Sequence, residues 1–217
     1  MRYGTPKWLG VGAAVAAAGL AYHTALRPRM NRWGATQTEA RRPLPGDELS
    51  PDPFLHSTRA ITIDAPPYAV WPWIAQVGYG RAGWYSYDWV ERLMFAGRYA
   101  EGHSATWIHP ELQDLREGDV VPFGVGVRIP VTAIEPEKYL VIGKSWAFVL
   151  EDLSDGRTRL LVRTRGPGWV RAPLQRIPVL RQIGAAIDYA IGEPLHHFME
   201  RKMMLGVVER AEALVRI

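Results

Sequence analysis

The pattern of apolar and polar residues predicts a strand that passes directly into a helix near residue 60. Apolar and polar side chains alternate through Ile61–Asp64, which is the period of a strand with one buried face. Pro66-Pro67 then stops strand pairing and suits the first turn of a helix. The apolar residues of Val70–Val77 follow at helical spacing, so we expect a helix there that is kinked at Pro72.

Further along the chain the pattern predicts antiparallel hairpins. Strand-like segments span Val127–Ile134 and Tyr139–Ile142, and two more, Trp146–Leu153 and Arg157–Thr164, flank the turn signal Asp155-Gly156. Consecutive hairpins predict an antiparallel meander with one face of the sheet exposed to water.

A long helix is predicted at the end of the chain. The segment Pro194–Ile217 begins with proline and contains no further proline. Leu195, Phe198, Met199 and Met203 fall on one face of that helix.

Two of these segments carry a resemblance to a known family. Arg59–Leu93 (RAITIDAPPYAVWPWIAQVGYGRAGWYSYDWVERL) and Glu193–Gly206 (EPLHHFMERKMMLG) resemble the START-like, helix-grip domains of the polyketide cyclase/dehydrase and lipid-transport (SRPBCC) superfamily. Arg41–Leu49 (RRPLPGDEL) resembles the segment that precedes the domain in a membrane-anchored bacterial branch. The resemblance covers roughly Thr58–Ala213. It implies an α+β fold in which a curved antiparallel sheet surrounds a long C-terminal helix and encloses an apolar cavity.

The N-terminal residues predict a transmembrane anchor. Trp8–Leu26 has no formal charge apart from a possible one on His23, and its length is close to the ~20 residues that span a bilayer. Because Ala and Gly dominate this segment, a cleavable signal peptide and a soluble helix are the alternatives. Five arginines lie between Arg27 and Arg42, so the positive-inside rule places the main domain in the cytoplasm.

These patterns divide the chain into four parts. Residues 1–7 form a tail, 8–26 the anchor, 27–57 a Pro-rich tether, and 58–217 the START-like domain. The tether has five prolines and no sustained periodicity, which predicts a segment that runs along the domain surface. A chain of 217 residues is long enough for one well-buried domain with such an appendage.

A group of aromatic residues predicts the ligand site. A cavity walled by Trp and Tyr offers apolar area together with a few N–H and O–H groups that orient a ligand, and methionines add an adaptable surface. The alternative is that these side chains only fill the core. We expect the ligand-binding residues to be Trp71, Trp84, Tyr85, Tyr87, Trp89, Trp107, Trp146, Phe148, Met199 and Met203.

The sequence contains little that indicates catalysis, and we expect no catalytic residue, cofactor or metal. Cysteine is absent, and His196-His197 lacks the spacing of metalloprotease ligands. Gly78–Gly83 (GYGRAG) matches the dinucleotide fingerprint, but a Pro-containing helical segment precedes it, which favours a simple turn. Asp88 and Glu91 form a possible carboxylate pair, although capping or solvated roles are the plainer interpretation.

Seven arginines and no acidic residue lie between Gly156 and Ile187. The plain interpretation is a solvated strand face followed by a surface loop. The alternative is contact with anionic lipid headgroups, which an interfacial Trp would favour. Nucleic acid is not expected as a partner, because the rest of the domain is balanced in charge and no reading motif is present. The expected membrane-surface residues are Trp169, Arg171, Arg176 and Arg181.

Three functions are compatible with the sequence. The leading hypothesis is a membrane-anchored module that binds a hydrophobic small molecule or a lipid in the aromatic-lined cavity. The first alternative is a cyclase/dehydrase-like enzyme acting on a polyketide-type or other hydrophobic substrate. The second is a tethered interaction protein with a packed core. An all-apolar pocket would favour the first, a pocket with Asp88, Glu91 or a histidine the enzyme, and no pocket the last.

Overall fold

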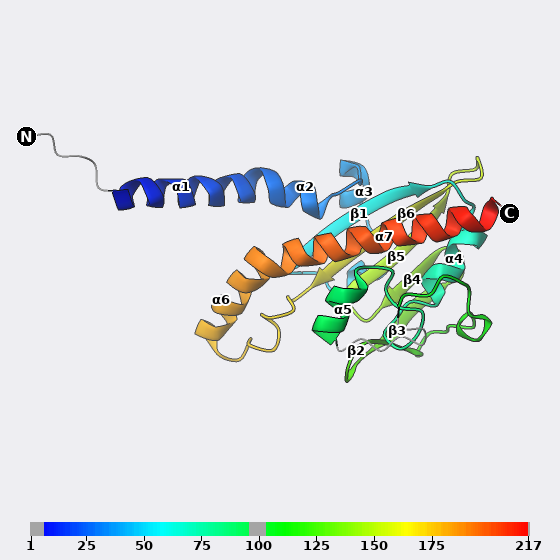
Figure 1. Ribbon diagram of the computed structural model, residues 1–217. Helices are drawn as coiled ribbons and strands as arrows, with labels where there is room; N and C mark the ends of the chain where they lie inside the picture. Colours follow the sequence, from blue (N-terminus) through cyan, green and yellow to red (C-terminus); the bar gives the residue numbers. More distant parts are fainter. Residues whose placement is uncertain (1–6, 96–102, 217) are drawn as a thin grey trace, which may run out of the picture.

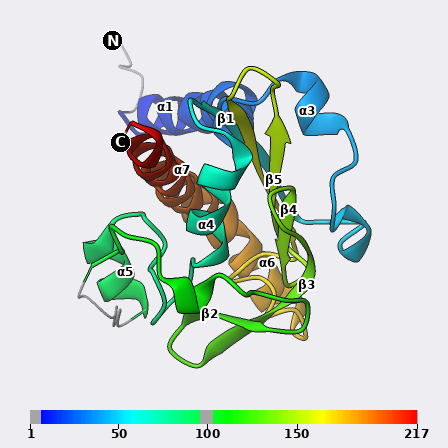
Figure 2. The same ribbon diagram turned by 90° about the vertical axis from the view of Figure 1, so that its right-hand side faces the viewer.

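A six-stranded antiparallel sheet packs against one long C-terminal helix in the computed structural model, which describes residues 7–95 and 103–216 (Figure 1). The strand order in the sheet is β1-β6-β5-β4-β3-β2. The helix, α7, spans Glu193–Val215 and lies across the inner face of the sheet (Figures 1 and 2). The fold is therefore α+β, as predicted. The strands are β1 Leu55–Ile63, β2 Val120–Gly124, β3 Val127–Glu135, β4 Tyr139–Ile142, β5 Trp146–Asp152 and β6 Thr158–Gly166.

The predicted hairpins are present with small shifts at their ends. Strands β3 to β6 pair consecutively and antiparallel, and the turn between β5 and β6 contains Gly156 at a φ of 82°. The first strand then pairs with the last, since Ile61 lies opposite Leu160. The short strand β2 was not predicted. It contains Pro122, and its pairing with β3 shifts register between Pro122 and Gly124.

The main core lies between the sheet and two helices. Helix α4 (Pro67–Ala75) starts at the predicted Pro-Pro signal and contains Pro72. Its apolar side chains, including Val70 and Ile74, pack with residues of α7 and of the strands, such as Met204 and Leu160. This helix, the inner face of the sheet and α7 together form one contiguous apolar cluster.

The glycine-rich segment after α4 forms a tight turn. Gly78 and Gly83 form an antiparallel bridge, and both have positive φ values, 136° and 82°. A Cβ at Gly83 would lie 2.8 Å from Ser104 Oγ, so the close approach of these two segments requires glycine. The predicted turn is therefore confirmed.

The outer face of the sheet is covered, contrary to the prediction that it would be exposed to water. Residues 33–50 cross this face and include the short helices α3 (Gln37–Arg41) and η2 (Asp47–Leu49). We call residues 33–50 the strap. Leu44 of the strap packs with Val149 and Leu161 in a second small apolar cluster. Leu161, which breaks the simple alternation of its strand, is therefore buried on the outer side.

Arginines of β6 hold the strap in place. Arg163 is buried and donates to the backbone carbonyls of three strap residues and to the Asp47 carboxylate. Arg159 forms an ion pair with Glu39 at 2.8 Å, and this contact lowers the pKa of Glu39 to about 2. Arg165 donates to the Ser50 carbonyl oxygen at 2.9 Å. These arginines are not the solvated strand face that their sequence pattern predicts.

The transmembrane anchor predicted for residues 8–26 is not supported. Within residues 7–95 and 103–216, no helix combines the length and the apolar character needed to cross a bilayer. Helix α1 (Lys7–Ala21) has 15 residues dominated by Ala and Gly. The assignment of a single-pass protein, with the cytoplasmic placement drawn from it, is therefore wrong.

The helical run continues through η1 (Tyr22–Leu26) and α2 (Arg27–Asn31), which belong to the body of the fold. Arg27 donates to both carboxylate oxygens of the buried Glu193, at 2.6 and 2.7 Å. The Tyr22 hydroxyl donates to the Tyr189 carbonyl oxygen at 2.7 Å. These contacts join the run to the start of α7, while α1 extends away from the sheet (Figure 1).

Candidate functional site

A cavity of about 320 Å³ lies between the open end of the sheet and the first half of α7. Its wall is built from the loop before α5 (Asp88–Phe95), strands β2 and β5, the loop after β6, the helices α6 (Pro178–Ile187) and η4 (Asp188–Gly192), and α7. The lining residues are Trp84, Ser86, Phe123, Trp146, Trp169, Val170, Ile187, Asp188, Ile191, Gly192, Leu195, His196, Met199, Glu200 and Met203.

Stacked aromatic rings form the sheet side of this cavity. The Trp84 and Trp146 rings stack with centroids 5.1 Å apart, and Phe123 packs on Trp84 at 5.3 Å. Behind them, Phe148 contacts Trp146 at 5.0 Å. Rings that pack on one another in this way have little rotational freedom, so the wall is pre-formed.

The helix side of the cavity follows from the spacing of residues on α7. Leu195, Met199 and Met203 recur every four residues, which places them on one face of a helix. His196 and Glu200 also recur at four residues, one position further along. An apolar stripe and a polar stripe of the same helix therefore border the same space.

The polar stripe is fixed by a buried ion pair. Arg59 of β1 pairs with Glu200, and both side chains are almost fully buried. Trp146 Nε1 donates to Glu200 Oε1 at 2.8 Å, and Thr164 donates to the same oxygen at 3.2 Å. Burial alone would raise the pKa of Glu200, but Arg59 beside it lowers the pKa below its ordinary value, so this carboxylate is ionised at neutral pH.

His196 is uncharged at neutral pH. Burial lowers its pKa to about 4, and although Glu200 opposes this shift, Arg59 reinforces it. The imidazole lies next to the Trp169 ring, with centroids 4.7 Å apart. A neutral imidazole therefore lines the cavity between a tryptophan and an ionised carboxylate.

Asp188 is a second buried carboxylate in the wall. It is fully buried and accepts hydrogen bonds from the backbone N–H groups of Val170 and Arg171, at 2.9 to 3.2 Å. A Cβ at Gly168 would lie 2.4 Å from this carboxylate, so the loop after β6 can fold around Asp188 only with glycine there. The carboxylate thus organises the loop that carries Trp169.

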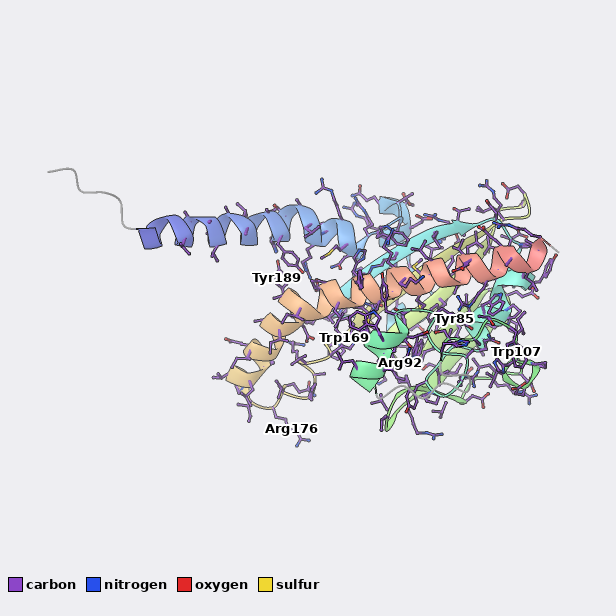
Figure 3. The ribbon with its side chains drawn as sticks, in the orientation of Figure 1. Tyr85, Arg92, Trp107, Trp169, Arg176 and Tyr189 are labelled. Carbon is purple, nitrogen blue, oxygen red and sulfur yellow. The ribbon has the colours of Figure 1, made fainter. Side chains whose placement is uncertain are left out.

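The mouth of the cavity lies beside a partly exposed apolar surface. Trp169 is 42% exposed, and Ile191 is 61% exposed although it lines the cavity. Figure 3 shows Trp169 beneath the first half of α7 and Arg176 projecting from the loop that precedes α6. The apolar surface therefore continues from the solvent into the cavity.

Four of the ten predicted ligand-binding residues line the cavity, and six do not. Those that line it are Trp84, Trp146, Met199 and Met203. Trp71, Tyr85 and Phe148 are buried in the main core instead, as the alternative interpretation held. Tyr87 stacks on Phe198, with centroids 4.4 Å apart, Trp89 is exposed, and Trp107 packs on His109 at 3.8 Å. Figure 3 shows Trp107 and Trp169 far apart along α7.

The predicted membrane-surface residues are divided by the structure. Trp169 belongs to the cavity wall, and Arg171 packs over the Phe54 ring at 4.7 Å. Arg176 and Arg181 lie on exposed positions of the loop after β6 and of α6. The basic block is therefore not one continuous surface, since its β6 members hold the strap.

Several residues that line the cavity were not predicted to bind the ligand, and only some of them could have been recognised from the sequence. Leu195 was placed on the apolar face of the last helix, and that face could have indicated its role together with Met199 and Met203. No sequence pattern indicated that Asp188, His196 and Glu200 line the cavity, because their burial depends on residues far away in the sequence. Arg59, for example, is 141 positions away from its partner Glu200.

The carboxylates considered for chemistry lie outside this cavity. Asp88 accepts hydrogen bonds from the Ser104 hydroxyl, at 2.9 Å, and from its backbone N–H. Glu91 is buried rather than solvated, and burial, with Asp88 nearby, raises its pKa to about 7. Across the described residues, no three His, Asp or Glu side chains are grouped so that they could hold a metal ion.

Comparison with known proteins gives no family assignment. No family model matches the chain, and no curated protein matches it. Among solved structures, the chain is similar to a protein from Arthrobacter aurescens determined by solution NMR as a structural-genomics target. The two chains share 14% identity and a TM-score of 0.35, over 74% of this chain and 87% of the other.

Proposed function

We propose that this protein binds an apolar small molecule or a lipid in the cavity beside α7. The observation that carries the proposal is an aromatic- and methionine-lined space of about 320 Å³, which falls at the lower end of the range of small-molecule sites. The sheet and α7 are compatible with a helix-grip arrangement, and the resemblance of Arg59–Leu93 to START-like domains adds support. An open space of this size disfavours the packed-core alternative.

An environment-sensitive apolar fluorophore tests this proposal. It should bind the full chain with a saturable increase in emission. Leu195→Trp and Met199→Trp each fill the cavity and should reduce that binding at least tenfold. Phe198→Trp is the matched control, because it adds a tryptophan to an exposed position of the same helix. Folded protein that binds no fluorophore, or equal loss in all three variants, would refute the proposal.

A second candidate function, an enzyme acting on a hydrophobic substrate, is favoured by one observation. The neutral His196 lies beside open volume and next to the ionised Glu200. An uncharged imidazole can accept a proton from a bound substrate, while the carboxylate stabilises the resulting imidazolium. Both oxygens of Glu200 are already hydrogen-bonded, so His196 is the candidate base; its Nδ1 lies 3.5 Å from Arg59 Nη1 and its Nε2 3.5 Å from Glu200 Oε1, so the ring would have to turn to meet a substrate.

The enzyme can be tested with poly-β-ketone chains, whose cyclisation and dehydration release water. Mass spectrometry should then detect products lighter by the mass of water. His196→Gln should abolish their formation and leave fluorophore binding unchanged. If the unaltered protein forms no such products, the enzyme hypothesis is refuted and only the binding proposal remains.

We also propose that α6 contacts an anionic lipid surface. Ile187 lies on the exposed apolar stripe of α6 and also lines the cavity, so the stripe leads into the cavity mouth. Basic residues beside an apolar helix face favour anionic headgroups. The stripe and its basic neighbours are Val179, Leu180, Ile183, Ile187, Arg176 and Arg181.

A further inference from the structure

The carboxylates and the hydroxyl of the cavity wall are already occupied by protein groups. Both oxygens of Glu200 accept hydrogen bonds from protein donors, and Asp188 accepts backbone N–H groups of the loop after β6. The Ser86 hydroxyl donates to the Met199 carbonyl oxygen at 2.9 Å. The surface that remains for a ligand is therefore almost entirely apolar.

Two aromatic side chains of the wall also turn their ring nitrogens away from the open space. His196 Nδ1 lies 3.5 Å from Arg59 Nη1, and His196 Nε2 lies 3.5 Å from Glu200 Oε1. Trp84 Nε1 has no acceptor among the described residues, but it also has practically no accessible surface, so a ligand does not reach it. A polar group that enters the cavity therefore loses its water and gains almost no partner, which costs free energy.

The cavity has an open end and a closed end, and α7 with the turn before it shows the direction between them. Ile191, Leu195, Met199 and Met203 all line the cavity and recur every four residues. The first is 61% exposed, the next two are half-buried, and Met203 is 2% exposed. A ligand can therefore keep contact with water at the Ile191 end, whereas the Met203 end is shielded from solvent.

We infer that the cavity takes an amphiphile whose polar groups are confined to one end, and that this molecule enters with its apolar end first. The apolar end lies against Trp84 and Met203, and the polar end stays hydrated at the mouth, beside Trp169 and Ile191. This inference rests on the proposed binding function and specifies the class of ligand and its orientation. It also implies that the cavity discriminates by where a polar group lies along the ligand.

Two isomers of one molecule test this inference by displacement of the bound fluorophore. Decane-1,2-diol can keep both hydroxyl groups at the mouth, whereas decane-1,10-diol must carry one of them into the closed end. The 1,2-isomer should displace the fluorophore at a concentration at least tenfold lower than the 1,10-isomer. Decan-1-ol and decane-1,2-diol should differ by less than about threefold, because the added hydroxyl stays in water. This comparison needs no variant, so it is decisive whatever a substitution does to folding.

Met203→Gln locates the discrimination at the closed end. Glutamine places donors and an acceptor there in a side chain of similar length, so the preference for the 1,2-isomer should fall at least threefold. Ile191→Gln, at the mouth, is the matched control and should leave the preference unchanged.

Equal displacement by the two diols, or displacement by neither, would overturn the inference. A folded Met203→Gln protein with the same isomer preference as Ile191→Gln would also overturn it. Failure of the fluorophore itself to bind would instead refute the proposed function.

Discussion

Two buried carboxylates, those of Glu200 and Glu91, differ in the hydrogen-bond and ion-pair partners that surround them. Glu200 is matched by Arg59, Trp146 and Thr164, so its charge is compensated. Glu91 of α5 is equally buried, yet neither of its oxygens has a hydrogen-bond partner among the described residues. The backbone N–H groups of Ser86 and Trp84 lie near enough to lower its pKa slightly, but burial and the nearby Asp88 outweigh them. An ionised carboxylate that is buried without such partners destabilises the folded protein, and protonation removes the charge.

Glu91 should therefore make stability depend on pH. Its folded-state pKa of about 7 lies above the ordinary value of 4.5. Below pH 4.5 the group is protonated in both states and costs nothing. As pH rises from 4.5 to 7 the unfolded chain loses the proton first, so stability falls, and above pH 7 the full penalty is on the order of 3 kcal/mol.

Urea unfolding of Glu91→Gln at pH 5.0 and pH 8.0 measures this penalty. The variant should be more stable than the unaltered protein at pH 8.0, by a few kcal/mol, and nearly equal to it at pH 5.0. Glu209→Gln, on an exposed position of α7, should show no such pH-dependent gain. A Glu91→Gln variant that is less stable at pH 8.0 would mean that the carboxylate is ionised and paired.

Local sequence patterns predicted most of the strands and helices, whereas the position of the strap depends on contacts between residues far apart in the sequence. The hairpins from β3 to β6 and the Pro-initiated helices α4 and α7 follow from alternation, turn residues and helical spacing, all of which act within a few residues. The strap has no such periodicity. It takes its place from Arg159 and Arg163, which are more than 110 residues away from their partners.

The same distinction explains which candidate site residues were found. Composition could indicate a Trp-rich cavity, but Trp146 lines it while Phe148, two residues on along the same strand, lies in the core behind it. Whether a side chain of β5 lines the cavity or lies in the core depends on the positions of α7 and of the loop after β6, which no local sequence pattern specifies. Trp71 and Tyr85 were overestimated for the same reason.

Arg163 should be the residue that attaches the strap. Arg163→Met removes donors from three strap carbonyls and from Asp47 in a buried setting, so we expect a loss of about 3 kcal/mol in the free energy of unfolding. The measurement is urea unfolding combined with limited proteolysis. Cleavage should appear within residues 33–50 before the sheet unfolds.

Arg157→Met is the control for this loss. Arg157 lies at the exposed end of the same hairpin, and its one ion pair among the described residues is with the nearby Asp155, so its removal should leave the melting temperature unchanged. Similar effects of the two substitutions would mean that the strap contributes little to stability.

For the whole molecule, the α6 surface predicts selective binding to lipid vesicles. The protein should sediment with vesicles that contain anionic phospholipid more than with neutral ones, and the preference should fade as salt rises, because exposed charges are screened within ~10 Å at 0.1 M. Arg176→Glu with Arg181→Glu should weaken sedimentation, whereas Arg157→Glu should not. Equal sedimentation with both vesicle types would leave α6 without a lipid role.

The strap also determines where a shortened chain can begin. A chain from residue 51 onward lacks the strap, leaves Leu161 and Val149 uncovered, and should aggregate or melt at a much lower temperature. A chain from residue 32 onward keeps the strap and loses the contacts that Tyr22, Arg27, Met30 and Asn31 make with Tyr189, Glu193 and Arg59. It should remain soluble. Light scattering and thermal melting distinguish the two, and a stable chain from residue 51 would contradict the role given to the strap.

The position of β6 finally sets the order in which the chain can fold as it is synthesised. Strand β1 and the strap emerge first, yet β6 is the one strand that pairs with β1 among the described residues, and the strap is held by arginines of β6. A nascent chain that ends before Thr158 therefore lacks the strand that pairs with β1 and the arginines that hold the strap. The strap and β1 therefore lack these partners until about three quarters of the protein has been made, a long interval in which a chaperone can bind them.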